Sequence, residues 1–174
     1  MGDIRLVSFG PVDTDLLLNL TDNLTLAFNN PAAAGLQLEI PAEAFDAGRD
    51  QYLALAFLMA LRGLAGFDRS KLLGVTEVDL YSTGLNFVFG QADVGGRAAV
   101  ISLARLSPGT DGDGSLLRDR AIKEAVHELG HTFGLEHCPD RLCVMHFSNG
   151  IADTDVKSGA FCPRHKGRSS NFSI

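Results

Sequence analysis

The chain has 174 residues, of which 45% are hydrophobic and 21% are charged, and its formal net charge at pH 7 is −6. This length and composition predict one globular domain with its own core and exclude a disordered chain. The negative charge excludes a broad cationic surface, so we expect no nucleic acid and no anionic membrane among the partners.

Neither a targeting segment nor a membrane anchor is predicted. The first ten residues, MGDIRLVSFG, favour a strand over a charged and apolar leader. The longest apolar run, at 52–61, is too short to span a bilayer. The three cysteines cannot all pair within one chain, and their clustering with histidines predicts reduced thiolates on a metal. We therefore expect a cytoplasmic protein, and a monomer.

The predicted elements alternate between strands and helices along most of the chain. In order they are a strand at 4–9, a helix at 13–24, a strand at 36–40, a helix at 50–62, strands at 75–82, 85–92 and 97–106, a polar loop at 107–115 and a helix at 115–133. This order predicts an α/β or α+β fold, with a mixed sheet of about five strands covered by helices. We expect a single domain over 1–174, with a sheet-and-helix part at 1–134 and a C-terminal part at 135–174.

The last predicted helix carries the motif HELGHTFGLEH, residues 127–137, and all five histidines and three cysteines lie between His127 and His165. With about 100° per residue, the helix separates into two faces. The apolar face, which we expect against the core, contains Ile122, Val126, Leu129 and Phe133. The polar face contains Arg120, Glu124, Glu128 and His131.

The spacing of His127, Glu128 and His131 is that of a helical zinc motif. Two histidines one turn apart present two imidazole nitrogens from one rigid surface, which suits a tetrahedral zinc ion. Glu128 is rotated by about a quarter turn, so it can reach a water at the metal without being a ligand. This is the position of a general base.

Gly134 explains how a third histidine can join this pair. If the helix continued, His137 would lie about 9 Å beyond His131, out of reach of the same metal. A glycine can take a positive φ and end the helix, which lets the chain return. We therefore predict His127, His131 and His137 as three ligands, with a fourth position open, as in catalytic zinc sites.

A second metal site is predicted from Cys138, Cys143, Cys162 and His165, because three thiolates and one imidazole form a closed tetrahedral set typical of structural zinc. Neighbouring residues in extended chain point in opposite directions, so His137 and Cys138 can serve different metals. With three thiolates and a neutral imidazole, this site would carry a net charge of −1.

Other interpretations of the same residues stay open at this point. The cysteines could be free and buried, or Cys138 and Cys143 could form a disulfide. His146 is a rival fourth ligand, although the CxxH spacing of Cys162 and His165 favours His165. The three-histidine site suits zinc first, but iron or nickel could also occupy it.

The run HELGHTFGLEHCPDRLCVM, residues 127–145, resembles the archaemetzincins, a branch of the metzincin zinc peptidases. Their pattern is HExxHxxGxxHC followed by four residues, C, x and M, with a later CxxC. The matching positions are His127, Glu128, His131, Gly134, His137, Cys138, Cys143 and Met145. Residues 80–92 and 99–106 are also similar, so the resemblance covers about 75–165. One departure is His165, which stands where the family has cysteine.

The resemblance implies a metzincin-like compact domain with a zinc-bound C-terminal subdomain and two zinc ions, one catalytic and one structural. Glu128 would activate the attacking water, and Met145 would form the Met-turn under the metal. The strand near 98–104 would line the cleft and pair with an extended substrate. The chain has no tyrosine after Met145, so the zinc and groups that the sequence does not identify would stabilise the oxyanion, with His146 as one candidate.

The function that this implies is a zinc metallopeptidase acting on a peptide or protein. Two alternatives keep the metals: a zinc-stabilised binding or regulatory protein without proteolysis, and an amidohydrolase of small molecules. Glu128 favours hydrolysis, because a structural site needs no carboxylate beside an open coordination position.

Overall fold

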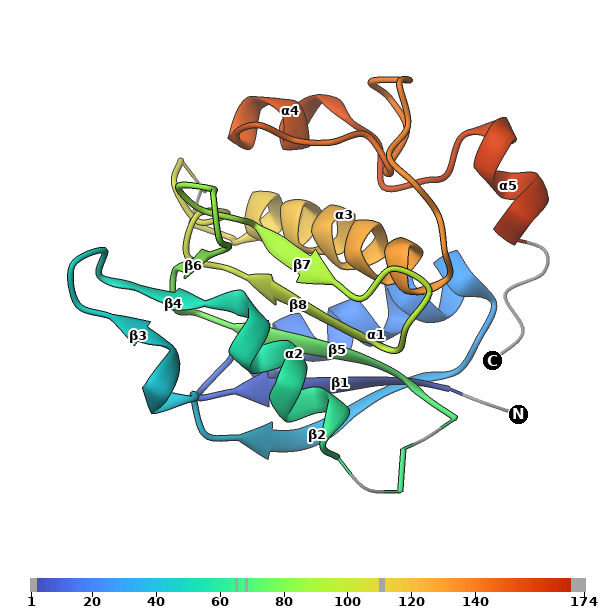
Figure 1. Cartoon of the computed structure of the whole chain (residues 1–174). Coiled ribbons are helices and arrows are strands. Elements are labelled where there is room, and N and C mark those ends of the chain that lie inside the picture. The colour runs from blue at the N-terminus through green and yellow to red at the C-terminus, as the bar shows by residue number, and fades with distance from the viewer. Residues whose placement is uncertain (1–2, 65, 68, 110–111, 170–174) are drawn as a thin grey trace.

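A five-stranded mixed sheet forms the centre of the protein (Figure 1). The computed structural model describes residues 3–64, 66–67, 69–109 and 112–169. The sheet has the order β2-β1-β5-β8-β7, with β1 Ile4–Phe9, β2 Ala32–Leu38, β5 Lys71–Thr76, β7 Gly90–Ala92 and β8 Ala98–Ser102. Strands β2, β1, β5 and β8 run parallel to one another, and β7 runs antiparallel to β8. The predicted mixed sheet of about five strands is confirmed.

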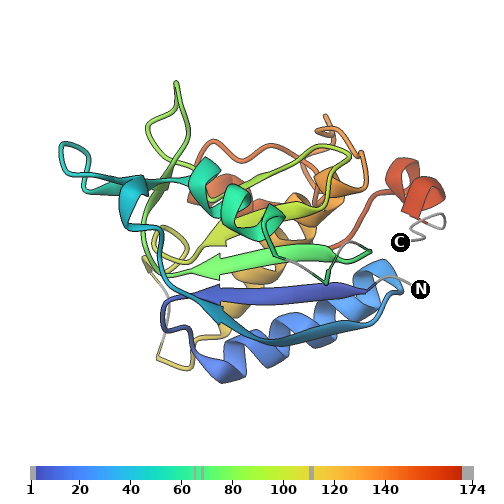
Figure 2. The ribbon, with the colours of Figure 1, turned by 60° about the horizontal axis from the view of Figure 1, so that its bottom comes forward.

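Helices cover both faces of this sheet (Figure 2). On one face, α1 (Thr14–Phe28) and α3 (Ser115–Thr132) pack on the core that contains Ile4 and Leu6 of β1. On the other face, α2 (Ala54–Arg62) packs on the core that contains Val7 and Phe9. Successive side chains of a strand alternate between the faces, so a strand covered on both sides is apolar throughout. No helix of the described residues is long and apolar enough to cross a membrane.

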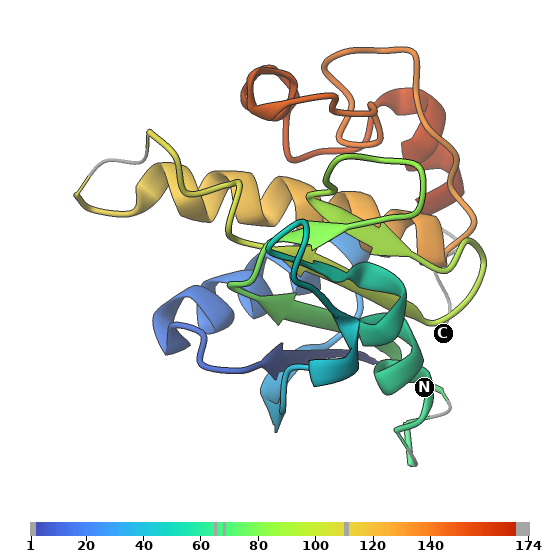
Figure 3. The same cartoon turned by 60° about the vertical axis from the view of Figure 1, so that its left-hand side comes forward.

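Smaller elements surround this centre. A second sheet joins β3 (Phe45–Asp46), β4 (Gln51–Leu53) and β6 (Leu80–Tyr81), after a 3-10 turn at Ala42–Ala44. The C-terminal part carries α4 (Ile151–Val156) and α5 (Pro163–Ser169). Figures 1 and 3 show the segment with α4 lying along α3, on the side away from α1.

Several predicted boundaries are wrong. The strand expected at 75–82 is centred earlier, at 71–76, and only 90–92 of the strand expected at 85–92 belongs to the sheet. The helix expected from residue 50 begins at Ala54, because residues 51–53 form β4. Strands buried on both faces have no polar alternation to mark their ends. Residues 110–111 of the predicted loop lie outside the described residues.

Helix α3 has the predicted extent, but both of its faces are buried. The polar face was expected to contrast with a core-facing side, yet Arg120, Glu124 and Glu128 are 4%, 3% and 6% exposed. The segment around α4 provides charged partners for two of these side chains. Arg120 forms an ion pair with Asp155, and Lys157 forms one with Glu124. The charges of Arg120 and Glu124 are therefore neutralised by partners that follow α3 in the chain.

Candidate metal centre and active site

Two histidines on α3 are held in one orientation by backbone carbonyls. His127 Nδ1 lies 2.8 Å from the carbonyl oxygen of Val144, and His131 Nδ1 lies 2.7 Å from that of Leu135. A carbonyl oxygen only accepts hydrogen bonds, so each Nδ1 carries the proton and donates it. Each Nε2 keeps its lone pair, and the two Nε2 atoms lie 3.2 Å apart.

This pair of nitrogens fits a zinc ion. Two neutral imidazoles with facing lone pairs repel each other unless a cation lies between them. In a tetrahedron with zinc–nitrogen bonds of 2.0–2.1 Å, two nitrogens are separated by roughly 3.3–3.4 Å, close to the separation of the Nε2 atoms. Burial lowers the pKa of His127 well below its usual value, as do the charges of Lys157 and His131. The imidazole is thereby kept neutral, the state that a metal ligand requires.

The third histidine reaches the pair because α3 ends in a glycine turn. Gly134 has a φ of +80°. Its N–H donates to the carbonyl of His131 at 2.9 Å, and the N–H of Leu135 donates to that of Gly130 at 3.1 Å, the pattern of a Schellman C-cap. The ring centre of His137 then lies 4.8 Å from that of His131. One nitrogen from each of His127, His131 and His137 lies within 4.8 Å of the others.

Glu128 lies beside this group, packed against a glycine on the neighbouring strand. Its carboxyl is 6% exposed, and burial raises its pKa well above the usual value; Glu124 acts in the same direction, and Lys157 opposes both. A Cβ atom at Gly90 of β7 would lie 2.6 Å from Glu128 Cγ and 2.7 Å from the carbonyl oxygen of Val100. Gly90 thus makes room for Glu128. The sequence did not identify this residue, whose only signal is a glycine within a predicted strand.

Met145 packs directly on the α3 segment that separates the two helical histidines. Its side chain is fully buried, and a Cβ atom at Gly130 would lie 2.5 Å from its sulfur. The carbonyl of Met145 accepts a hydrogen bond from the N–H of Cys138 at 2.9 Å. Met145 therefore lies against the helix and beside the segment of the third histidine.

The three cysteines and one histidine gather in a second group, in the C-terminal part. Their ligand atoms lie within 4.8 Å of one another: Cys138, Cys143, Cys162 and His165. The two sulfurs of Cys138 and Cys162 are 3.8 Å apart, and His165 Nδ1 lies 3.4 Å and 3.6 Å from the sulfurs of Cys162 and Cys143. Tetrahedral zinc separates two such sulfurs by roughly 3.8 Å, and a sulfur from a nitrogen by roughly 3.5–3.6 Å.

Two of the other interpretations of these residues, a disulfide and a ligand role of His146, find no support in the structure, whereas the cysteines are free and two of them are buried. All three cysteines are free thiols, so Cys138 and Cys143 form no disulfide. His146 belongs to neither metal group; its Nδ1 donates to the carbonyl of Cys138 at 2.9 Å. Burial raises the pKa of the Cys143 thiol to about 11, so a metal must displace a proton to bind there.

Comparisons with known proteins agree with this geometry. The family model "Peptidase family M54" matches residues 20–168. The chain belongs to this family. An archaemetzincin of Pyrococcus abyssi is 47% identical over 173 residues, covering 94% of this chain and 92% of the relative. One of Methanopyrus kandleri is 53% identical over 126 residues, covering 72% and 70%.

Solved structures of archaemetzincins have the same fold. The crystal structure of the archaemetzincin from Methanopyrus kandleri matches with a TM-score of 0.87 at 41% identity, covering 97% of this chain and 93% of that one. The archaemetzincin from Archaeoglobus fulgidus matches with a TM-score of 0.84 at 37% identity, covering 95% and 99%. The resemblance seen in the sequence is confirmed, and the chain is a zinc metallopeptidase of this family.

The cleft of this family M54 peptidase lies between α3 and β7. The expectation that the strand near 98–104 pairs with a substrate is wrong, because β8 lies between β5 and β7 and is buried throughout. The free edge on this side belongs to β7. A pocket opens between that edge and α3, and its lining includes Gly90, His127 and Glu128 but not His146.

Proposed function

We propose that this peptidase binds two zinc ions and cleaves peptide bonds with Glu128 as its general base. The observation that carries the proposal is a group of three imidazoles beside a buried carboxyl, with His127 of the group and Glu128 lining one open pocket. The catalytic ion would be held by His127, His131 and His137. The structural ion would be held by Cys138, Cys143, Cys162 and His165.

The residues of the chain have separate tasks in this reaction. Zinc at the three-histidine site would supply a Lewis acid that polarises a carbonyl and makes water more acidic. Glu128 takes the proton of the attacking water and gives it to the leaving amine. The carbonyls of Val144 and Leu135 fix the imidazole tautomers. Met145 supports α3 from below the histidines.

The edge of β7 is the proposed place for the substrate backbone. An extended peptide can add to a free strand edge through backbone hydrogen bonds, which fix its register. Gly90 is the first residue of β7 and touches Glu128, so a peptide on this edge passes the general base. The scissile carbonyl then lies between Glu128 and the three histidines.

We further propose that the chain acts as one catalytic domain and as a monomer. Its sheet-and-helix part, 1–134, ends with the active-site helix, and its C-terminal part, 135–174, supplies Met145 and the second metal group. All seven proposed ligands come from one chain, so neither proposed metal site needs a residue of a second copy. Three free thiols close to one another suit a reducing compartment, and we propose the cytoplasm.

A peptide library tests this proposal. The zinc-loaded wild type is incubated with a mixed library beside Glu128→Gln, and cleavage products are identified by mass spectrometry. We expect cuts by the wild type, and a rate at least 10²-fold lower for Glu128→Gln with zinc retained. The matched control is Glu136→Gln, which removes the same charge from an exposed position near the end of α3. Equal cleavage by wild type and Glu128→Gln would refute the role of Glu128.

A further inference from the structure

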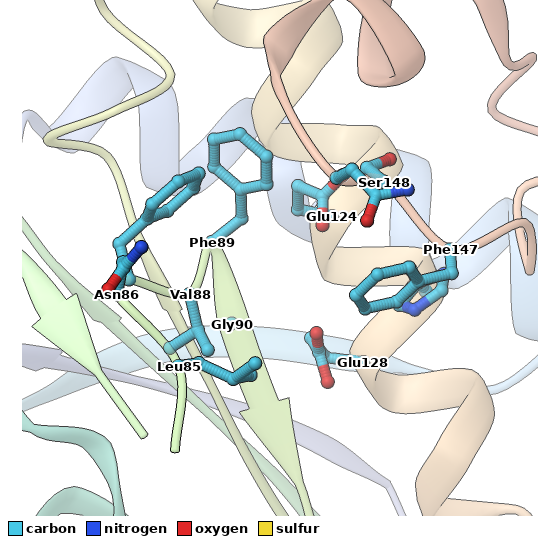
Figure 4. A pocket seen from close by; sticks show the side chains of 12 residues that line it. Leu85, Asn86, Val88, Phe89, Gly90, Glu124, Glu128, Phe147 and Ser148 are labelled. Atoms are coloured by element: carbon cyan, nitrogen blue, oxygen red, sulfur yellow. The ribbon is translucent and has the colours of Figure 1, made fainter. Parts of the chain in front are cut away.

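A cavity of about 220 Å³ opens beside Glu128, between β7 and α3 (Figure 4). Its apolar walls are Leu85, Phe87, Val88, Phe89 and Phe147. The volume is many times the ~10–15 Å³ that one water molecule needs, so a large side chain fits. Because His127 and Glu128 also line the cavity, its occupant is a side chain next to the scissile bond.

Glu124 gives this cavity a polar end. It lies one turn before Glu128 on α3 and is 3% exposed. Lys157, fully buried, places its Nζ 2.8 Å from Glu124 Oε1, and the hydroxyl of Thr154 donates to the same oxygen at 3.1 Å. Among the described residues, no hydrogen bond reaches Oε2 of Glu124, whose side chain lines the cavity. Oε2 is therefore the acceptor available to an occupant.

The ion pair determines which occupant suits this acceptor. Lys157 neutralises the charge of Glu124. A lysine or arginine of the substrate would therefore lose its hydration in the cavity without finding a free negative charge to pair with. An aspartate or glutamate would face two carboxyl groups, Glu124 and Glu128. The side chain that fits is neutral, has an apolar body for the walls and carries a hydrogen-bond donor at its tip.

Ser148 adds a second hydrogen-bonding group. It lines the cavity, and Figure 4 shows it at the same end as Glu124. Its Oγ is buried and has no hydrogen-bond partner within the described part of the chain. A serine hydroxyl rotates to donate or to accept. A phenol does both as well, so one phenol can donate to Glu124 Oε2 and, once the buried Ser148 side chain rotates to expose its Oγ, accept from Ser148.

We propose that this cavity is a subsite for tyrosine, an inference that rests on the proposed peptidase function. The tyrosine ring packs against the phenylalanine walls, in the edge-to-face or offset arrangements that aromatic pairs prefer. Its hydroxyl pairs with Glu124 and Ser148 at the polar end. A phenylalanine fills the walls equally well but leaves Oε2 of Glu124 desolvated and without a donor, which is the unfavourable case for a buried polar group.

Defined peptides test the subsite. The series is acetyl-Ala-Ala-Ala-Xaa-Ala-Ala-amide, where Xaa is tyrosine, phenylalanine, 4-methylphenylalanine or lysine, so that only one side chain is large enough to fill the cavity. We expect kcat/KM for the tyrosine peptide to exceed that for the phenylalanine peptide at least tenfold. The 4-methylphenylalanine peptide, which matches tyrosine in size without its donor, should be no better than phenylalanine. Equal values for tyrosine and phenylalanine, or a preference for lysine, would overturn the proposal.

Two variants connect the preference to the polar end. Glu124→Leu combined with Lys157→Met removes the acceptor and its counter-charge together, so no buried charge is left unpaired. The tyrosine-to-phenylalanine ratio should fall to about one in this variant, and several-fold in Ser148→Ala, which keeps the ion pair. Circular dichroism and zinc content show whether each variant is folded. A ratio that stays at the wild-type value in folded variants would overturn the assignment to Glu124 and Ser148.

A binding measurement separates the subsite from catalysis. The same peptides, with a fluorescent label, are titrated against zinc-loaded Glu128→Gln by fluorescence anisotropy. If the wild type cuts no peptide, the proposed function fails; tenfold tighter binding of the tyrosine peptide would still support the subsite. Equal binding of the tyrosine and phenylalanine peptides, or no binding of either, would overturn it.

Discussion

Replacing Gly90 by alanine should disturb Glu128 through a single methyl group. The added Cβ would lie 2.6 Å from Glu128 Cγ, 2.9 Å from Glu128 Oε1 and 2.7 Å from the carbonyl oxygen of Val100. Carbon atoms in favourable contact are about 3.5–4.0 Å apart, so the overlap with Cγ is about 1 Å. The Val100 oxygen belongs to β8, which is fixed by strands on both sides, so Glu128 or the edge strand must move.

The expected size of the effect follows from this overlap. Overpacking of this kind costs roughly 1–3 kcal/mol of unfolding free energy. A displacement of about 1 Å at a catalytic group can cost about 10²-fold in rate. We therefore expect Gly90→Ala to lower kcat/KM by about 10²-fold while zinc stays bound, since no histidine contacts the new methyl group among the nearest atoms.

The assay compares kcat/KM, zinc content and urea unfolding for the wild type and two variants. The matched control is Gly159→Ala, whose Cβ would meet its nearest atom, Ile122 Cγ2, at an ordinary 3.9 Å. That variant should stay within about 0.5 kcal/mol of the wild type and keep its activity. If Gly90→Ala also kept wild-type activity and stability, the reasoning about this contact would be refuted.

Three further changes have defined outcomes. Lys157→Met leaves the Glu124 carboxylate buried without its partner and should lower the unfolding free energy, measured with urea, by about 3–5 kcal/mol. Adding Glu124→Leu should restore most of this loss. An unchanged urea midpoint in Lys157→Met would contradict the pairing. Gly134→Ala places a residue with a Cβ atom at a φ of +80° and should lower the unfolding free energy by about 1–2 kcal/mol. It should also weaken zinc binding, because the turn at Gly134 positions His137. Unaltered zinc affinity would show that the turn does not position this histidine. The amides of Cys138 and Val144 donate hydrogen bonds to the carbonyls of Met145 and Ala160. Removing metal with EDTA should speed hydrogen exchange at these two amides more than at the amides of β1. An equal change at all of these amides would speak against a metal link in the C-terminal part.

The histidine and cysteine groups could be predicted because their chemistry is encoded locally. The spacing of His127 and His131 on a helix and the glycine at position 134 determine the first group almost without tertiary information. The boundaries of α3 were predicted within one residue for the same reason. The second group needed only a chain that folds back between Cys143 and Cys162, and the CxxH spacing indicated His165 over His146.

Features that depend on distant partners could not be predicted in this way. The polar face of α3 suggested exposure, but its charges are buried by partners such as Asp155 and Lys157, more than thirty residues further along the chain. The apolar composition of the strand predicted at 98–104 does not distinguish an edge strand from an interior strand. Only the observed sheet order shows that β7, and not this strand, lies at the edge of the sheet. The role of Gly90 could not be predicted for the same reason, because its contact with Glu128 joins two elements that are far apart in the sequence.

The most direct test of the central claim is the number of zinc ions per chain, measured by native mass spectrometry on the wild type beside His131→Ala and His165→Ala. The two metal groups share no ligand, so each substitution should empty one site and leave the other. We predict two ions in the wild type and one in each variant, with peptide cleavage lost completely only in His131→Ala. A wild type with fewer than two ions, or a variant that keeps both, would contradict this account of the two sites.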